Sequence, residues 1–138
     1  MAADRTKLLR GVPLFADLDR RELNEVGSSL RERTFAAGDT VLSEGHAGVG
    51  FFVIVDGEAT VTVRGEERTK LGAGDYFGEI ALITGSERTA TVTADSDLSC
   101  LALTSWEFRP LVEQNGTIAW KLLSALAKKL PRREQLAT

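Results

Sequence analysis

Residues 76–92 read YFGEIALITGSERTATV, and the rest of the chain is interpreted around them. Gly78 and Glu79 precede a short apolar run at 80–83, and a polar turn separates that run from Arg88. Four apolar residues are too few for an independently stable helix, so we expect one helical turn held by tertiary contacts. The N–H groups of a first helical turn are unpaired, and a glycine before them lets an anion approach the backbone. The stretch therefore predicts an anion-binding pocket.

Arg88 and Glu79 carry opposite charges and suit different parts of a ligand. A guanidinium presents a planar fork that matches two phosphate oxygens, and such a contact contributes about 1.5–3 kcal/mol. A carboxylate does not suit a phosphate, but acidic residues accept hydrogen bonds from ribose hydroxyls in other nucleotide-binding folds. Two interpretations follow from the pair alone: one loop that reads a phosphate and a ribose, or an exposed ion pair of little energetic weight.

The stretch resembles the phosphate-binding cassette of the cyclic-nucleotide-binding domain family, which includes the regulatory subunit of cAMP-dependent protein kinase and the bacterial catabolite activator proteins. The F-G-E-(hydrophobic)-A-L core, the nine-residue step from Glu79 to Arg88 and the R-T-A-T-V exit are present without gaps. With the whole cassette in register, binding is favoured over the ion pair. The resemblance implies a ligand-binding set that consists of Gly78, Glu79, Ile80, Ala81, Arg88, Thr89 and Ala90.

The resemblance also implies a role for several of these residues. Glu79 is expected to bind the ribose 2′-hydroxyl and Arg88 the exocyclic phosphate oxygens, while the backbone of Gly78 and Ala81 contacts the sugar and the phosphate. Thr89 occupies a position where many relatives have a small residue and where a threonine is associated with tolerance of cGMP. The expected ligand is therefore cAMP or cGMP, with the choice of base left open.

Short β-rich segments alternate with glycine-marked turns from residue 34 to residue 104. The segment at 51–55 is continuously apolar, which is typical of a strand buried on both faces. Short antiparallel strands at regular spacing predict a mainly β fold, a jelly-roll β-barrel with flanking helices. The expected strands lie at 40–42, 51–55, 59–64, 68–71, 89–94 and 98–103.

A helical segment is expected before the barrel. Asp19 and Glu22 have the spacing of a capping box, and apolar residues follow at helical spacing, which predicts a helix at about 20–30. We expect a single domain at 1–138, with an N-terminal helical segment at 1–33, the barrel at 34–104 and the cassette at 76–92.

Two helices are expected at 105–138, after the barrel. Ser105 is a candidate N-cap for the first, but Pro110 predicts that this helix starts late or bends there. Thr117 is expected to cap the second helix, which should end near Leu130 because Pro131 follows.

A basic tail follows the second helix. A gap-free extension of the resemblance places Arg132 and Arg133 where relatives contact the base, so either guanidinium is a candidate to stack on it. A charged tail also fits a solvated surface. Trp120 lies off the centre of the apolar stripe of the second helix. It has three interpretations: a residue at the edge of the core, a self-association contact, or part of a lid over the base.

Composition excludes several classes of function. Hydrophobic residues make up 43% of the 138 residues and charged residues 27%, which is typical of a soluble globular protein. A net charge of −3 argues against a broad nucleic-acid-binding face. No apolar run has the length of a membrane span or a signal peptide, so a cytoplasmic protein is expected. A single histidine, His46, cannot build a cupin metal site, and Cys100, the single cysteine, cannot form an internal disulfide.

The predicted function is that of a stand-alone cyclic-nucleotide sensor without catalysis or a cofactor. Ligand binding is expected to move the C-terminal helix, and the protein partner or effector is left unspecified. Because the sequence ends at residue 138, no DNA-reading domain of the kind found in the family's transcription factors is expected. The alternatives are a degenerate jelly-roll interaction module that no longer binds nucleotide, and a detached regulatory segment of a channel, kinase or acyltransferase.

Overall fold

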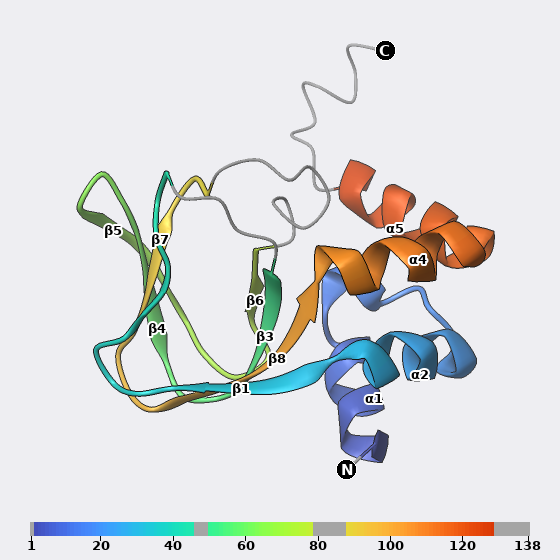
Figure 1. Cartoon of the computed structure of the whole chain (residues 1–138), viewed down its shortest axis with the longest axis horizontal. Helices are drawn as coiled ribbons and strands as arrows, with labels where there is room; N and C mark the ends of the chain where they lie inside the picture. Colours follow the sequence, from blue (N-terminus) through green and yellow to red (C-terminus); the bar gives the residue numbers. More distant parts are fainter. Residues whose placement is uncertain (1, 46–49, 79–87, 129–138) are drawn as a thin grey trace. The chain divides into compact units, whose positions relative to one another are not determined.

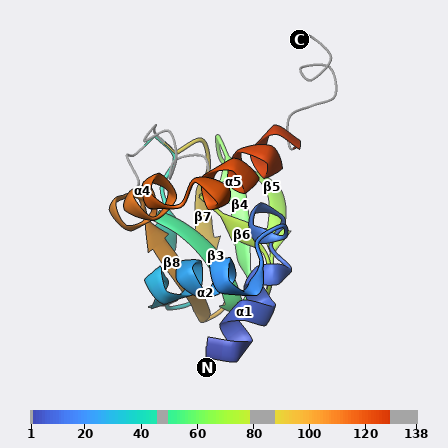
Figure 2. The same cartoon turned by 90° about the vertical axis from the view of Figure 1, so that its right-hand side faces the viewer.

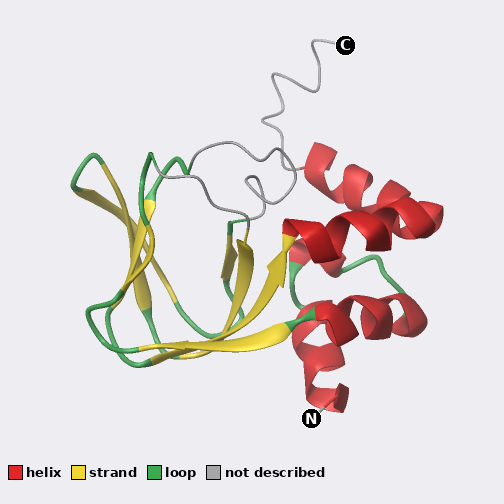
Figure 3. Cartoon of the chain, in the orientation of Figure 1, coloured by secondary structure: helices red, strands yellow, loops and turns green. Residues whose placement is uncertain are grey.

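The computed structural model describes residues 2–45, 50–78 and 88–128, drawn in colour in Figure 1. The chain forms two compact units, one made of Met1–Ser28 with Arg109–Thr138 and the other of Ser29–Phe108. All the described strands belong to the second unit, which we call the barrel unit, and the first, which we call the helical unit, consists of helices and turns (Figure 3).

Two antiparallel four-stranded sheets make up the barrel unit in the described part of the chain. Their strand orders are β1-β8-β3-β6 and β2-β7-β4-β5. This arrangement, with helices at both ends of the chain, confirms the predicted jelly-roll fold. The strands are β1 (Arg31–Phe35), β2 (Thr40–Leu42), β3 (Gly50–Asp56), β4 (Ala59–Val63), β5 (Glu66–Leu71), β6 (Tyr76–Phe77), β7 (Thr91–Ala94) and β8 (Leu98–Thr104).

The inner faces of the two sheets form the core of the barrel unit. Phe52 of β3 stacks on Phe77 of β6 with the ring centres 5.2 Å apart, and Phe35 of β1 meets Phe52 edge-on at 6.1 Å. These aromatic contacts join three strands of one sheet. The remaining buried members of this cluster are Ile54, Ala59, Val92, Ala94, Leu98, Cys100 and Ala102.

Most expected strands are present, with shifted ends. The strand at 40–42 is confirmed, and the apolar segment at 51–55 lies within β3, whose residues 51–54 are all buried. Strand β5 begins two residues before the expected 68, and β7 begins two residues after the expected 89. The sequence did not predict β1, because four of its five residues are exposed on an edge strand and carry no apolar alternation.

The described part of the helical unit contains α1 (Ala2–Arg10), the 3₁₀ turn η1 (Pro13–Phe15), all but the last residue of α2 (Arg20–Ser29), the later part of α4 (Ser105–Gln114) and α5 (Gly116–Lys128). The predicted capping box of α2 is confirmed in both directions. The Asp19 N–H donates to Oε1 of Glu22 at 2.8 Å, and the Glu22 N–H donates to Oδ1 of Asp19 at 2.9 Å. The same Oε1 atom accepts a hydrogen bond from Nζ of Lys121 at 2.7 Å, so α2 and α5 share one polar contact.

Helix α4 (Ser105–Gln114) begins at Ser105 and contains Pro110 in its interior, so of the two outcomes expected from this proline the late start is excluded. The expected cap of the following helix is wrong. Helix α5 begins at Gly116, so Thr117 lies inside it, and Asn115 forms the boundary by donating its side-chain N–H to the Leu111 carbonyl at 2.7 Å. The expected end of the helix near Leu130 lies outside the described residues.

Trp120 is 74% exposed, which contradicts its interpretation as an edge-of-core residue. Within the described part of the chain, no helix is long and apolar enough to cross a membrane.

Candidate functional site

The side chain of Arg88 is buried in the barrel unit, with 6% of its surface exposed. Its Nη2 donates a hydrogen bond to the Gly50 carbonyl at 2.8 Å, and its Nη1 donates to the Gly78 carbonyl at 3.4 Å. Gly50 is the first residue of β3, and Gly78 directly follows β6, which pairs with β3 (Figure 2). One sheet therefore provides both acceptors that orient the guanidinium.

The buried charge of Arg88 is incompletely compensated by the described residues. Both acceptors are neutral carbonyl groups, and no carboxylate in the described ranges forms an ion pair with this side chain. The Nε atom is buried and has no hydrogen-bond partner among them. Burial lowers the pKa of the guanidinium below its ordinary value, because the charged form loses hydration. A buried cation of this kind favours binding of an anion.

Gly78 allows the backbone to come close to this guanidinium. Its φ of +91° is one that side-chain-bearing residues rarely adopt. A Cβ at this position would lie 2.5 Å from the Gly50 carbonyl oxygen and 3.0 Å from Nη1 of Arg88. Both the conformation and the available space therefore require glycine here.

The backbone around Arg88 is anchored by the segment that follows β2. The Gly45 N–H donates to the Arg88 carbonyl at 2.9 Å, and the Glu44 N–H donates to Oγ1 of Thr91 at 3.0 Å. The Glu44 carboxylate in turn accepts the Arg64 N–H at 2.9 Å, from the turn between β4 and β5. These three contacts fix the chain on the side of Arg88 that leads into β7.

Four of the sequence-predicted site residues lie in the described ranges. Arg88 and Gly78 are in direct contact, Thr89 is exposed, and Ala90 is half-buried before β7. The others, Glu79, Ile80, Ala81, Arg132 and Arg133, lie outside the described residues.

Gly50 is a contact that the sequence did not predict as part of the site. Its carbonyl is the nearer of the two acceptors for Arg88. No sequence signal marks a backbone carbonyl as an arginine partner, since every residue has one.

Comparison with known proteins gives matches over most of the chain. Residues 32–115 match the family model described as "Cyclic nucleotide-binding domain". A cyclic nucleotide-gated potassium channel of Rhizobium etli is 39% identical over 113 residues, which cover 82% of this chain and 32% of the channel. The chain thus spans about a third of that relative's length.

Solved structures agree with these matches. The N-terminal domain of a transcriptional regulator from Streptomyces coelicolor A3(2) superposes with a TM-score of 0.83 at 32% identity, covering 95% of this chain and 94% of that one. The regulatory domain of Toxoplasma gondii PKA, crystallised with cAMP, superposes with a TM-score of 0.74 at 32% identity, covering 84% of this chain and 46% of that one.

Proposed function

The chain belongs to the cyclic nucleotide-binding domain family, and we propose that it is a non-catalytic sensor that binds cAMP or cGMP at residues 76–92. The observation that carries this proposal is the buried guanidinium of Arg88, 6% exposed and oriented by two neutral carbonyl groups. Burying a cation without a counter-ion costs free energy. A cyclic phosphodiester supplies one negative charge and two exocyclic oxygens, which match the remaining N–H groups of the fork.

The same observation disfavours a degenerate module that has lost its ligand. A domain without an anionic ligand would gain stability by replacing the buried arginine with an apolar residue. We therefore interpret the retained charge as functional. Catalysis is not part of the proposal, since an anion-binding arginine and backbone amides bind and orient a nucleotide without supplying a nucleophile or a general base.

The roles of the other cassette residues follow the family resemblance and are part of the proposal. Glu79 binds the ribose 2′-hydroxyl, and the backbone of Gly78 and Ala81 contacts the sugar and phosphate, with Ile80 between them in the ligand-binding set. Thr89 and Ala90, which follow Arg88 in the sequence, line the part of the site that binds the phosphate. Arg132 or Arg133 covers the base.

Calorimetric titration of the purified chain with cAMP and cGMP tests the function directly. Arg88→Leu is expected to lower affinity by about tenfold or more, since a charge-assisted contact to phosphate is lost. Arg68→Leu, which removes a half-exposed arginine of β5, is the matched control and should bind normally. Equal affinity of the parent and Arg88→Leu, or no binding of either nucleotide to the parent, would overturn the proposal.

The Glu79 role has a separate test. The analogue 2′-deoxy-cAMP should bind more weakly than cAMP to the parent, because it lacks the hydroxyl that Glu79 accepts from. In Glu79→Ala the two nucleotides should bind alike. A preference for cAMP that persists in this variant would exclude Glu79 as the ribose contact.

We further propose that ligand binding changes the environment of α5 and that an effector reads this change. A shift from 1% to 99% of a closed state needs about 5.5 kcal/mol of differential affinity. The exposed Trp120 reports on α5, and Trp106→Phe removes the second tryptophan. Saturating cAMP should then shift the emission of Trp120, and an unchanged spectrum at saturation argues against movement of α5. A cytoplasmic location belongs to the same proposal.

A further inference from the structure

Glu44 connects three segments of the barrel unit at the end where the backbone of Arg88 lies. Its Oε1 accepts the N–H of Arg64, in the turn between β4 and β5, at 2.9 Å. Its own N–H donates to Oγ1 of Thr91, the first residue of β7, at 3.0 Å. The next residue, Gly45, donates its N–H to the Arg88 carbonyl at 2.9 Å. The end of β2, the start of β7 and the β4–β5 turn therefore lie together (Figure 1).

Arg88 is held both at its guanidinium and at its backbone. The guanidinium donates to the carbonyl groups of Gly50 and Gly78, and these contacts set the direction of the fork. The Gly45 N–H binds the Arg88 carbonyl, and this contact sets the position of the backbone from which the side chain extends. A shift of that backbone would displace the guanidinium from a bound anion, and charge-assisted hydrogen bonds depend on distance and angle. The placement of the Gly45 N–H is therefore part of the geometry of the site.

The carboxylate of Glu44 is the part of this arrangement that belongs to a half-buried side chain. It forms no ion pair with a lysine or arginine in the described part of the chain. Its contact with the Arg64 N–H is a charge-assisted hydrogen bond, which is roughly twice as strong as a neutral one. The charge of Glu44 thus serves a bond between two segments of backbone.

We propose that Glu44 is a positioning residue for the phosphate site. By tying the β4–β5 turn to the segment after β2, its carboxylate keeps the Gly45 N–H on the carbonyl of Arg88. The inference rests on the proposed cyclic-nucleotide function and adds to it a residue that does not touch the ligand. Without the carboxylate, the segment loses one of its contacts, and ordering it again becomes a cost of ligand binding.

Amide hydrogen exchange of the nucleotide-free chain tests the anchoring step by itself. In Glu44→Ala the Gly45 amide should exchange at least about threefold faster than in the parent, because its hydrogen bond to Arg88 opens more often. Glu44→Gln retains an oxygen acceptor for the Arg64 N–H and should restore most of the protection. An unchanged Gly45 exchange rate in Glu44→Ala would overturn the proposal.

Calorimetric titration with cAMP tests the consequence for the site. Glu44→Ala should bind cAMP about threefold or more weakly than the parent. The loss of a negative charge would by itself favour an anion, so a charge effect and a positioning effect have opposite signs. Glu44→Gln loses the same charge but keeps the anchoring contact, and it should bind cAMP at least as tightly as the parent. Equal weakening in the alanine and glutamine variants would overturn the proposal.

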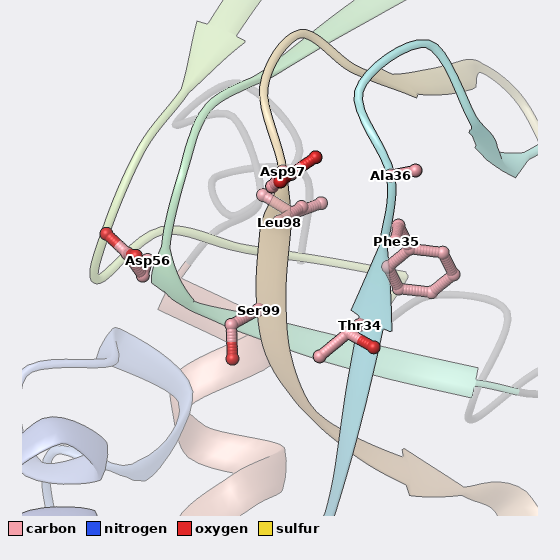
Figure 4. Close-up of a pocket in the computed structure, with 7 residues that line it drawn as sticks. All are labelled: Thr34, Phe35, Ala36, Asp56, Asp97, Leu98 and Ser99. Carbon is pink, nitrogen blue, oxygen red and sulfur yellow. The ribbon is translucent and has the colours of Figure 1, made fainter.

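Asp39→Ala is the matched control for both measurements. Oδ2 of Asp39 accepts the Ala36 N–H at 2.8 Å, so this variant also removes a carboxylate that binds a backbone N–H. Asp39 precedes β2 and Glu44 follows it, and Figure 4 shows Ala36 and Asp97 on turns at the Asp39 end of the strand. The control should leave the exchange of Gly45 and the affinity for cAMP unchanged. Equal loss of affinity in Asp39→Ala and Glu44→Ala would assign the effect to general destabilisation and overturn the proposal.

The two measurements also separate failure of this inference from failure of the proposed function. A parent chain that binds no nucleotide would overturn the proposed function and the positioning role together, while the exchange rates would still show whether Glu44 holds Gly45. A parent that binds cAMP with the same affinity as Glu44→Ala would overturn the positioning role and leave the proposed function intact.

Discussion

The Nη2 group of Arg88 donates a hydrogen bond at 2.8 Å to the carbonyl oxygen of Gly50, which lies 38 positions earlier in the chain. A second bond from Nη1 reaches the carbonyl of Gly78. Because β3 begins at Gly50 and pairs with β6, the sheet itself sets the direction of the guanidinium. The charge is thus oriented by regular structure, which limits the entropy lost when an anion binds.

Gly78→Ala should destabilise the fold and weaken nucleotide binding together. The new Cβ would meet the Gly50 carbonyl oxygen at 2.5 Å, at a φ of +91° that alanine rarely adopts. Strain of this kind costs on the order of 1–3 kcal/mol. If the backbone at position 78 shifts to relieve the strain, the carbonyl group that accepts a hydrogen bond from Arg88 moves with it. Urea unfolding and calorimetric titration with cAMP measure the two effects.

Gly72→Ala is the control for this prediction. Gly72 has no positive φ, and a Cβ there would meet nothing within 4 Å. The Gly72→Ala variant should have the same free energy of unfolding and the same affinity for cAMP as the parent. Similar losses in both variants would mean that the close approach at Gly78 is not the cause.

The sequence predicted those features of the fold that depend on contacts between residues close together in the chain. The capping box joins Asp19 and Glu22, three residues apart, so its spacing was visible in the sequence. The cassette motif singled out Arg88 as a phosphate contact, but it did not reveal the acceptor Gly50, because a contact over 38 positions leaves no periodic signal. Helix α4 extends through Pro110 although the proline removes one backbone hydrogen bond. Burial of Phe108 in the same helix stabilises it through tertiary packing, which helix propensities do not include.

Arg64→Asn should stabilise the barrel unit. Arg64 has a φ of +54° and is followed by Gly65 at +80°, a pair of positive values typical of a two-residue hairpin turn between β4 and β5. Asparagine tolerates this conformation better than arginine, so a gain of roughly 0.5–1 kcal/mol is expected. The Arg64 N–H that donates to Glu44 is retained. Urea unfolding measures the gain, and a loss of stability would show that the arginine side chain contributes a contact of its own.

Cys100 should make stability depend on pH in the alkaline range. Burial raises the pKa of its thiol from 9.0 to about 11, because the thiolate is poorly solvated in the core. The unfolded chain loses this proton at lower pH than the folded chain, so the contribution is complete below pH 9 and is lost as pH rises towards 11. The free energy of unfolding lost over this pH range is roughly 2–3 kcal/mol. Denaturation under reducing conditions should show this extra alkaline loss in the parent and not in Cys100→Ala; parallel pH curves would contradict it.

The contact between α2 and α5 predicts a second pH dependence with a different cause. Nζ of Lys121 lies 2.7 Å from Oε1 of Glu22, the atom that also accepts the Asp19 N–H. This hydrogen bond raises the pKa of Lys121 above its ordinary value of 10.5. The stabilisation is therefore complete below pH 10.5 and is lost as pH rises through the folded value.

Lys121→Met should accordingly lower the thermal midpoint at neutral pH, because it leaves the buried Glu22 carboxylate without its cation. The difference from the parent should shrink above pH 10.5, where lysine loses its charge in the parent as well. Lys7→Met removes an exposed lysine of α1 and should leave the midpoint unchanged at every pH. A deficit of Lys121→Met that stays constant into the alkaline range would assign the effect to lost packing of the lysine stem, since packing does not titrate.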